Sequence, residues 1–128
     1  MKPRVLRAKG RALSGYGATL PIYNVGINVF FDSDDMVDHS RLDHVKDKVN
    51  DCHGCCFAVG HDIYIFLKSK SANTVTHEVT HAVFEVYRHS GIVLDIDNQE
   101  PFAYLAGVIG QFVVDCIYKH EEIKGKGD

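Results

Sequence analysis

Two histidines and a glutamate occupy one short, otherwise apolar stretch, NTVTHEVTHAVFEV, at residues 73–86. His77 and His81 are four positions apart, so on a helix they differ by about 40° in azimuth and about 6 Å in height and can bind one metal ion. Glu78 would point beside that ion, where it can take a proton from water. The pattern H-E-x-x-H therefore predicts a zinc site in which Glu78 is the general base.

A catalytic zinc ion normally has three protein ligands and one open position, so a third donor is expected. Eighteen residues separate His81 from Glu100, which lies in the segment DNQEPFAYLAG. This spacing resembles that of the gluzincin metallopeptidases, and QEPFAYL is similar to the segment around the glutamate ligand of zinc aminopeptidases, where NEGFA is typical. The resemblance covers about residues 60–107 and implies that His77, His81 and Glu100 bind zinc.

The chain is similar to minimal single-domain gluzincins and to small phage-encoded proteins with the same motif. The resemblance implies a minimal zincin-like fold, and in that family the strand before the motif helix often rims the cleft and pairs with extended substrate. Residues 61–68, HDIYIFLK, would be that strand. The metzincin alternative requires Gly at position 84 and His at position 87, where this chain has Phe84 and Tyr87.

An additional donor usually stabilises the oxyanion of such a reaction. Tyr104 is the first candidate, because it lies four residues after Glu100 and so on the same helix face. Tyr64 and His89 are weaker candidates. Asp115 shares the azimuth of Glu100 but lies about 22 Å along a straight helix, too far to assist.

Each of these groups also has a structural interpretation. His77 and His81 could form a solvated helix face, and Glu100 could be a capping carboxylate three residues after Asp97. The CHGCC segment at residues 52–56 could be half of a structural zinc site, with Cys52 and Cys55 joined by His53, His61 or Cys116. Such sites usually take four ligands from two such segments, and the sequence holds only one.

Hydrophobic periodicity predicts an α+β domain with a small twisted sheet packed on about three helices. The strands are expected at residues 25–31 and 61–68, with 92–97 either a third strand or an extended turn. The helices are expected at residues 34–50, at 73–89 with Asn73 as N-cap and Gly91 ending it, and at about 99–119 with Asp97 or Asn98 as cap and Pro101 in the first turn. Gly107 and Gly110 in the last helix suggest that another element packs closely there.

The 128 residues predict a single domain over 1–128, in which residues 1–20 form an arm or first strand and 120–128 a polar tail. The net charge of −3 disfavours a nucleic-acid partner. Neither a signal peptide nor an apolar stretch of about 20 residues is recognised, which predicts no membrane partner. Crowded cysteines at positions 52, 55 and 56 favour reduced thiols and a cytoplasmic location, in a host cell if the chain is phage-encoded.

The leading hypothesis is a zinc metallopeptidase acting on a peptide or protein substrate, with Glu78 and Tyr104 as catalytic residues. One alternative is a non-catalytic, zinc-stabilised interaction protein of a phage or bacterium, whose metal ion fixes a small core. Another is a regulatory peptidase that cleaves a single repressor, although the chain has no room for the helix-turn-helix region that usually accompanies it. The sequence does not predict the oligomeric state.

Overall fold

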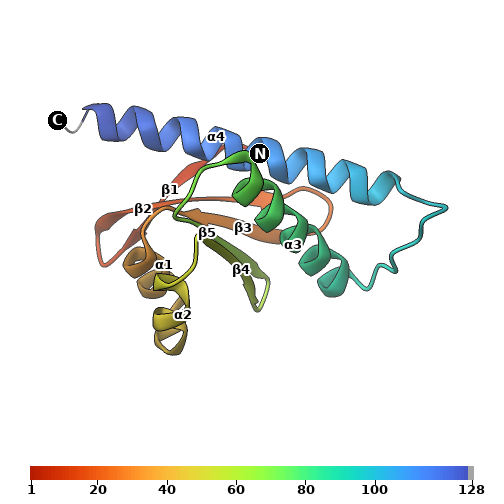
Figure 1. Ribbon diagram of the computed structural model, residues 1–128, viewed down its shortest axis with the longest axis horizontal. Coiled ribbons are helices and arrows are strands. Elements are labelled where there is room, and N and C mark those ends of the chain that lie inside the picture. Colours follow the sequence, from red (N-terminus) through yellow and green to blue (C-terminus); the bar gives the residue numbers. More distant parts are fainter. Residues whose placement is uncertain (127–128) are drawn as a thin grey trace.

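A mixed five-stranded sheet lies between two layers of helices in the computed structural model, which describes residues 1–126 (Figure 1). The strands are β1 (Arg4–Ala8), β2 (Arg11–Leu20), β3 (Val25–Phe30), β4 (Gly54–Val59) and β5 (Asp62–Leu67), in the order β1-β2-β3-β5-β4. The helices are α1 (Ser33–Ser40), the 3₁₀ turn η1 (Asp43–Val45), α2 (Lys46–Asn50), α3 (Ala72–Ser90) and α4 (Glu100–Lys126). The predicted α+β class is confirmed.

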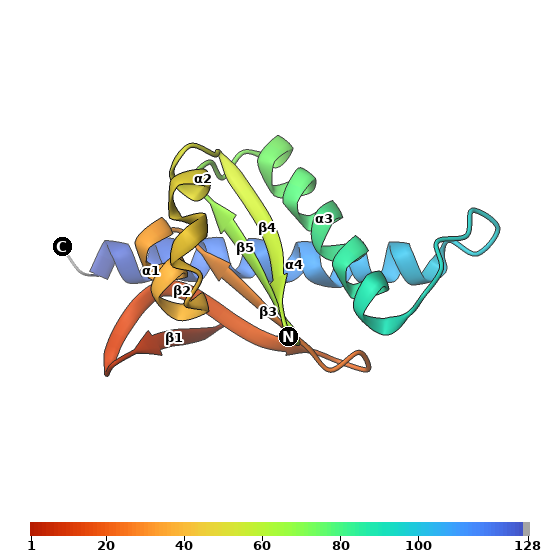
Figure 2. The same cartoon turned by 90° about the horizontal axis from the view of Figure 1, so that it is seen from below.

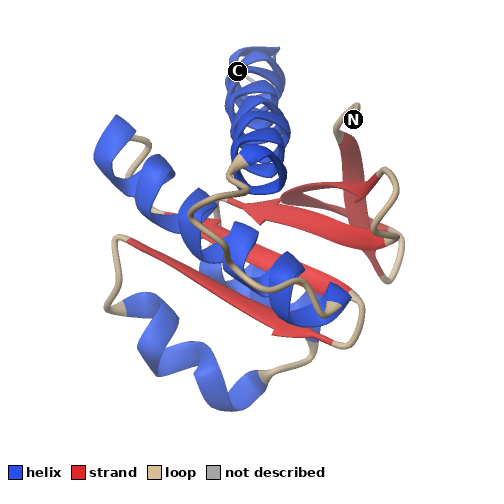
Figure 3. Ribbon diagram, turned by 90° about the vertical axis from the view of Figure 1, so that its right-hand side faces the viewer, coloured by secondary structure: helices blue, strands red, loops and turns tan. Residues whose placement is uncertain are grey.

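Strand β5 is the centre of the core. It pairs in parallel with β3 and antiparallel with β4, so both of its edges are occupied. Ile63 and Ile65 face α3 and α4 in one buried cluster, whereas Tyr64 and Phe66 face α1 and α2 in another. The strand is therefore covered on both faces, and Figure 3 shows helices on both sides of the sheet.

The N-terminal residues form two paired strands, β1 and β2, rather than an arm or a single strand. The single helix expected at 34–50 is broken, because Arg41 adopts a left-handed conformation (φ 62°) that ends α1. The chain then continues through η1 and α2. Residues 92–97 contain no strand; this segment joins α3 to α4 and ends in a turn in which the Asn98 N–H donates to the Asp95 carbonyl.

Helix α3 begins two residues earlier than predicted, since Asn73 was expected as its N-cap. Its N-cap is Ser71, whose hydroxyl accepts a hydrogen bond from the Thr74 amide at 3.2 Å. Serine at this position satisfies one of the free amides of the first turn. The predicted C-terminal stop is confirmed, since Gly91 adopts φ 69° and its N–H donates to the Tyr87 carbonyl.

Helix α4 begins at Glu100, has Pro101 in its first turn as predicted, and runs well beyond residue 119. Residues 120–126 are helical, and the last two residues of the predicted tail lie outside the described part of the chain. Figure 2, seen from the α1 and α2 side, shows α4 crossing behind the strands. Five of its side chains enter the core: Leu105, Ile109, Phe112, Val113 and Cys116.

Two expectations about α4 are wrong. A Cβ built on Gly107 or Gly110 would meet no other atom within 4 Å, so these glycines do not mark a close helix contact. In addition, α4 is long and apolar enough to cross a membrane by length and composition, contrary to the expectation that no such stretch exists. A core helix passes the same test, and the buried residues of α4 are those of a helix that covers a sheet.

Candidate metal centre

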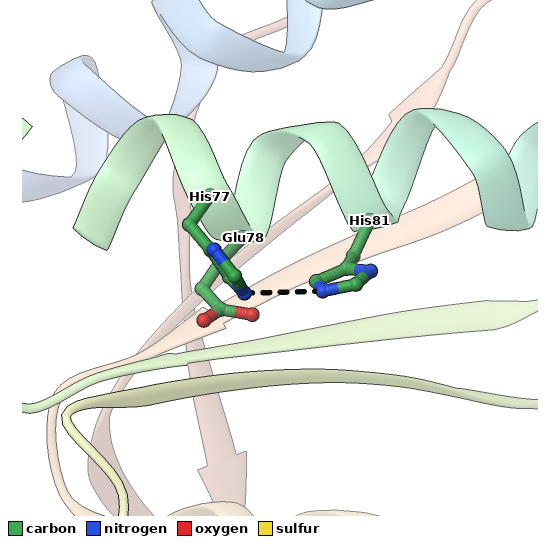
Figure 4. Close-up of side chains that lie close together, drawn as sticks. All are labelled: His77, Glu78 and His81. Atoms are coloured by element: carbon green, nitrogen blue, oxygen red, sulfur yellow. Dashed lines mark hydrogen bonds between the residues drawn. The ribbon is translucent and has the colours of Figure 1, made fainter. Parts of the chain in front are cut away.

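Helix α3 buries the glutamate of the His-Glu-His motif and leaves both imidazoles exposed. Val79, Val83 and Val86 are buried against the sheet, and this apolar stripe fixes the rotation of the helix. His77 and His81 are consequently exposed, whereas the neighbouring Glu78 is only 5% exposed. Figure 4 shows the three side chains extending from the same side of α3 toward β4 and β5.

The two imidazoles are close enough to bind a single ion. Their Nε2 atoms are 3.2 Å apart, and the rings meet edge to face with centroids 4.8 Å apart. Two nitrogen ligands at about 2.0–2.1 Å from a tetrahedral zinc ion would be separated by about 3.3 Å. One ligand atom each from His77, Glu78 and His81 can be chosen so that all lie within 4.8 Å of one another. This group could hold a metal ion.

Glu78 packs against the start of β4. A Cβ on Gly54 would lie 3.1 Å from both Cγ and Oε2 of Glu78, so the carboxyl rests directly over that glycine. Burial raises the pKa of Glu78, and the nearby His77 and His81 imidazoles partly offset this increase. A buried carboxylate whose pKa is raised is a better proton acceptor than an exposed one.

Glu100 is not a member of this group. It is exposed, and it lies nine residues before the buried Ile109, which places the two on opposite sides of α4. Figures 1 and 2 both show α4 starting beyond the last turn of α3. His77 and His81 lie further back, since α3 ends at Ser90. Ring contacts of Phe102 with Phe84 and Tyr87 confirm that the first turn of α4 packs on the second half of α3.

The candidates for the oxyanion donor lie in three different places. Tyr104 is 46% exposed on the same outer side of α4 as Glu100, so its role remains a prediction. The hydroxyl of Tyr64 is on the opposite face of the sheet, where it is 2.8 Å from Nδ1 of His39. His89 pairs instead with His61, and Asp115 accepts a hydrogen bond from Gln111 further along α4.

The strand expected to rim the cleft is not available to a substrate. Both edges of β5 are paired, whereas β4 is an edge strand that pairs only with β5. Sequence reasoning missed β4, because its first residues belong to the cysteine-rich CHGCC segment. Gly54 was the one residue that could have indicated this strand and its contact with α3, since a glycine in a strand often marks the close approach of another group.

The cysteines do not form the proposed half of a zinc site. All four thiols are free, and within residues 1–126 none belongs to a group that could hold a metal ion. Cys55 and Cys56 sit on opposite faces of β4, Cys55 toward α1 and α2 and Cys56 toward α3. Burial, with a smaller contribution from Glu78, raises the pKa of the Cys56 thiol and keeps it protonated.

No family model, no curated protein and no solved structure matches this chain. A function can therefore be inferred only from the geometry of His77, Glu78 and His81.

Proposed function

We propose that the chain is a metallopeptidase that binds zinc through His77 and His81 and uses Glu78 as its general base. The single observation that carries this proposal is the group of three ligand atoms on α3, with two exposed imidazoles beside one buried carboxyl. The donor set suits the ion, since neutral imidazole and carboxylate are zinc ligands. A zinc ion bound there supplies Lewis-acid activation of water and of the substrate carbonyl.

Glu78 would do the proton chemistry. Its carboxyl lies beside the imidazoles, and burial against Gly54 raises its pKa, so it can accept a proton from the attacking water. The same carboxyl can then pass that proton to the leaving amine. The contact with β4 holds the carboxyl in one place. A catalytic group that is already positioned loses less entropy when the transition state forms.

The free edge of β4 offers a place for an extended substrate. An edge strand presents unpaired backbone N–H and C=O groups that another chain can pair with. Gly54 and Cys56 on this strand face α3, close to Glu78. A peptide added alongside β4 would run past the imidazoles, and this arrangement supports a peptide or protein substrate.

The decisive experiment compares Glu78→Gln with Glu85→Gln. Glu85 lies seven residues further along, on the same side of α3, and is therefore a matched control. The zinc-loaded parent is expected to cleave members of a quenched-fluorescent peptide library. Glu78→Gln should keep its zinc, measured by elemental analysis, and lose cleavage by about 100-fold or more. Equal cleavage by Glu78→Gln and the parent would refute the proposal.

A third ligand is tested separately. The spacing predicts Glu100, which the structure leaves exposed and outside the group. If the Glu100 carboxylate binds the ion, Glu100→Gln should weaken zinc binding by about tenfold or more. Losing a residue that only hydrogen-bonds to a metal ligand already has an effect of about that size. An unchanged affinity would mean that solvent completes the coordination.

Tyr104→Phe tests the oxyanion role, with lower kcat at unchanged zinc content as the expected result.

A non-catalytic, zinc-stabilised protein is the second candidate. The position of Glu100 favours it, because a catalytic zinc ion normally has three protein ligands and, with Glu78 as the base, only His77 and His81 remain. In that case zinc binding would raise the melting temperature, and Glu78→Gln would change no activity because none exists.

A further inference from the structure

A second pair of imidazoles lies at the other end of α3. Nδ1 of His61 and Nε2 of His89 are 3.1 Å apart, and the rings meet edge to face with centroids 4.7 Å apart. His61 belongs to the turn between β4 and β5, and His89 to the last turn of α3. Both side chains are exposed. The proposed function uses neither of them.

The geometry of this pair matches that of His77 and His81. The nitrogen separations are 3.1 and 3.2 Å, and the angles between the rings are 82° and 71°. Two nitrogen ligands at about 2.0–2.1 Å from one ion lie about 2.9–3.4 Å apart when the angle at the ion is between about 90° and 109°. Both pairs fall within that interval.

The backbone holds each partner of the second pair in place. The His61 carbonyl accepts a hydrogen bond from the Gly26 amide at 2.9 Å, which ties the turn to β3. Gly60 adopts φ 58°, as the tight turn before β5 requires. On the other side, the Gly91 cap fixes the end of α3, so His89 stays on a regular helical turn. The two imidazoles are thus brought together by separate, ordered elements.

A carboxylate lies near His89, although it does not join the two imidazoles in a group of three ligand atoms. Glu85 is four residues before His89, on the same side of α3, and both line a cavity of about 240 Å³ together with Ala58 and Gly60. Arg88 lines the same cavity and lies 3.7 Å from a Glu85 oxygen, so part of the carboxylate charge is neutralised. Exposure of the imidazoles leaves the remaining coordination positions open to water.

We propose that His61 and His89 form a second divalent-cation site, which ties the β4–β5 turn to the end of α3. Imidazole donors favour borderline transition ions such as Zn²⁺, Ni²⁺ and Cu²⁺ over Mg²⁺ or Ca²⁺. His89 is eight residues after His81, about 12 Å along the helix, so one ion cannot serve both pairs. Because the ligands come from two elements, only the folded chain offers the site, and ion binding stabilises the fold.

The test starts from the full chain carrying His77→Ala and His81→Ala, which removes the first site. Zn²⁺ or Ni²⁺ alone is added to metal-free protein, and bound ion is measured by equilibrium dialysis with elemental analysis. Melting temperature is recorded in parallel. We expect about one ion per chain and a melting temperature that rises with ion concentration. Mg²⁺ at the same concentration should produce neither effect.

Adding His89→Gln or His61→Gln to this background should weaken binding by about tenfold or more and abolish the thermal shift. His44→Gln is the matched control, because His44 is an exposed histidine on η1, away from both pairs. Two results would overturn the proposal: a starting variant that binds no ion, or equal binding in the His89→Gln and His44→Gln variants. Since the first site is absent throughout, failure here leaves the peptidase proposal untouched.

Discussion

Gly54 and Glu78 are in such close contact that no side chain fits between them. A Cβ at position 54 would lie 3.1 Å from Cγ and Oε2 of Glu78, and 2.8 Å from Cγ2 of Thr74. Gly54→Ala should therefore displace the carboxyl and destabilise the fold by about 1–3 kcal/mol, as overpacking of a packed interface does. Urea unfolding measures the loss, and peptide cleavage should fall more than zinc content, because the imidazoles are not touched. Unchanged stability and cleavage would show that Glu78 can move aside without consequence.

Gly107→Ala should stabilise the fold, whereas Gly54→Ala should destabilise it. This glycine lies inside α4, is exposed, and has nothing within 4 Å of an added Cβ. Alanine there restricts the unfolded chain and favours the helix, so the free energy of unfolding should rise by about 0.5–1 kcal/mol. Thermal or urea unfolding checks this. A loss of stability would mean that another surface covers this side of α4 in solution.

Features that lie within a single helix or strand can be predicted from the sequence. Residues four apart on a helix share a side, so the convergence of His77 and His81 requires only that α3 forms and that its valine stripe faces the sheet. The strand β5 is predictable for a similar reason, because both of its faces are apolar along consecutive residues. Local periodicity is sufficient for each of these features.

The parts that depend on packing between elements were not predictable. The number of residues between His81 and Glu100 is fixed by the chain, but the direction of Glu100 is set by α4, whose five core residues turn the glutamate outward. Strand β4 shows no alternation of polar and apolar residues, because Cys56 and Phe57 are each half-buried on opposite faces. The break at Arg41 uses a left-handed conformation that a non-glycine residue adopts infrequently.

Glu78→Gln should change the stability of the metal-free chain in a pH-dependent way. Burial raises the pKa of Glu78 above its ordinary value of 4.5, so the folded chain holds a proton that the unfolded chain releases. The stability of the parent is then full below that ordinary pKa and is lost as pH rises through the folded pKa. Glutamine carries no charge, so the variant should be more stable than the parent near pH 7.

Urea unfolding of the parent and of Glu78→Gln at pH 7.5 and at pH 4 measures this effect, with chelator present to keep both proteins metal-free. The variant should have the higher free energy of unfolding at pH 7.5. The difference from the parent should shrink at pH 4, where Glu78 of the parent is uncharged as well. Glu85→Gln, on the same side of α3, provides the comparison. A variant that is less stable than the parent at both pH values would mean that the Glu78 carboxylate is stabilised in the fold.

His39 should make the protein sensitive to mild acid. Burial lowers the pKa of His39 below 6.5, although Asp62 partly offsets this, and its Nδ1 is 2.8 Å from the Tyr64 hydroxyl. Burial raises the pKa of Tyr64 to about 12, so that hydroxyl keeps its proton and can donate to the neutral imidazole. The unfolded chain therefore binds a proton that the folded chain excludes. The resulting stability is full above pH 6.5 and is lost as pH falls through the folded pKa.

Between pH 7.5 and pH 5 the parent should consequently lose more of its free energy of unfolding than His39→Gln does, so this variant should reduce the acid slope. Part of the slope should remain, because burial, together with Lys70, also lowers the pKa of His120. His44→Gln, which changes an exposed imidazole, is the control and should retain the slope of the parent. A His39→Gln variant with the full slope of the parent would place the acid sensitivity elsewhere. In that case the contact with Tyr64 would hold His39 equally well in its charged form.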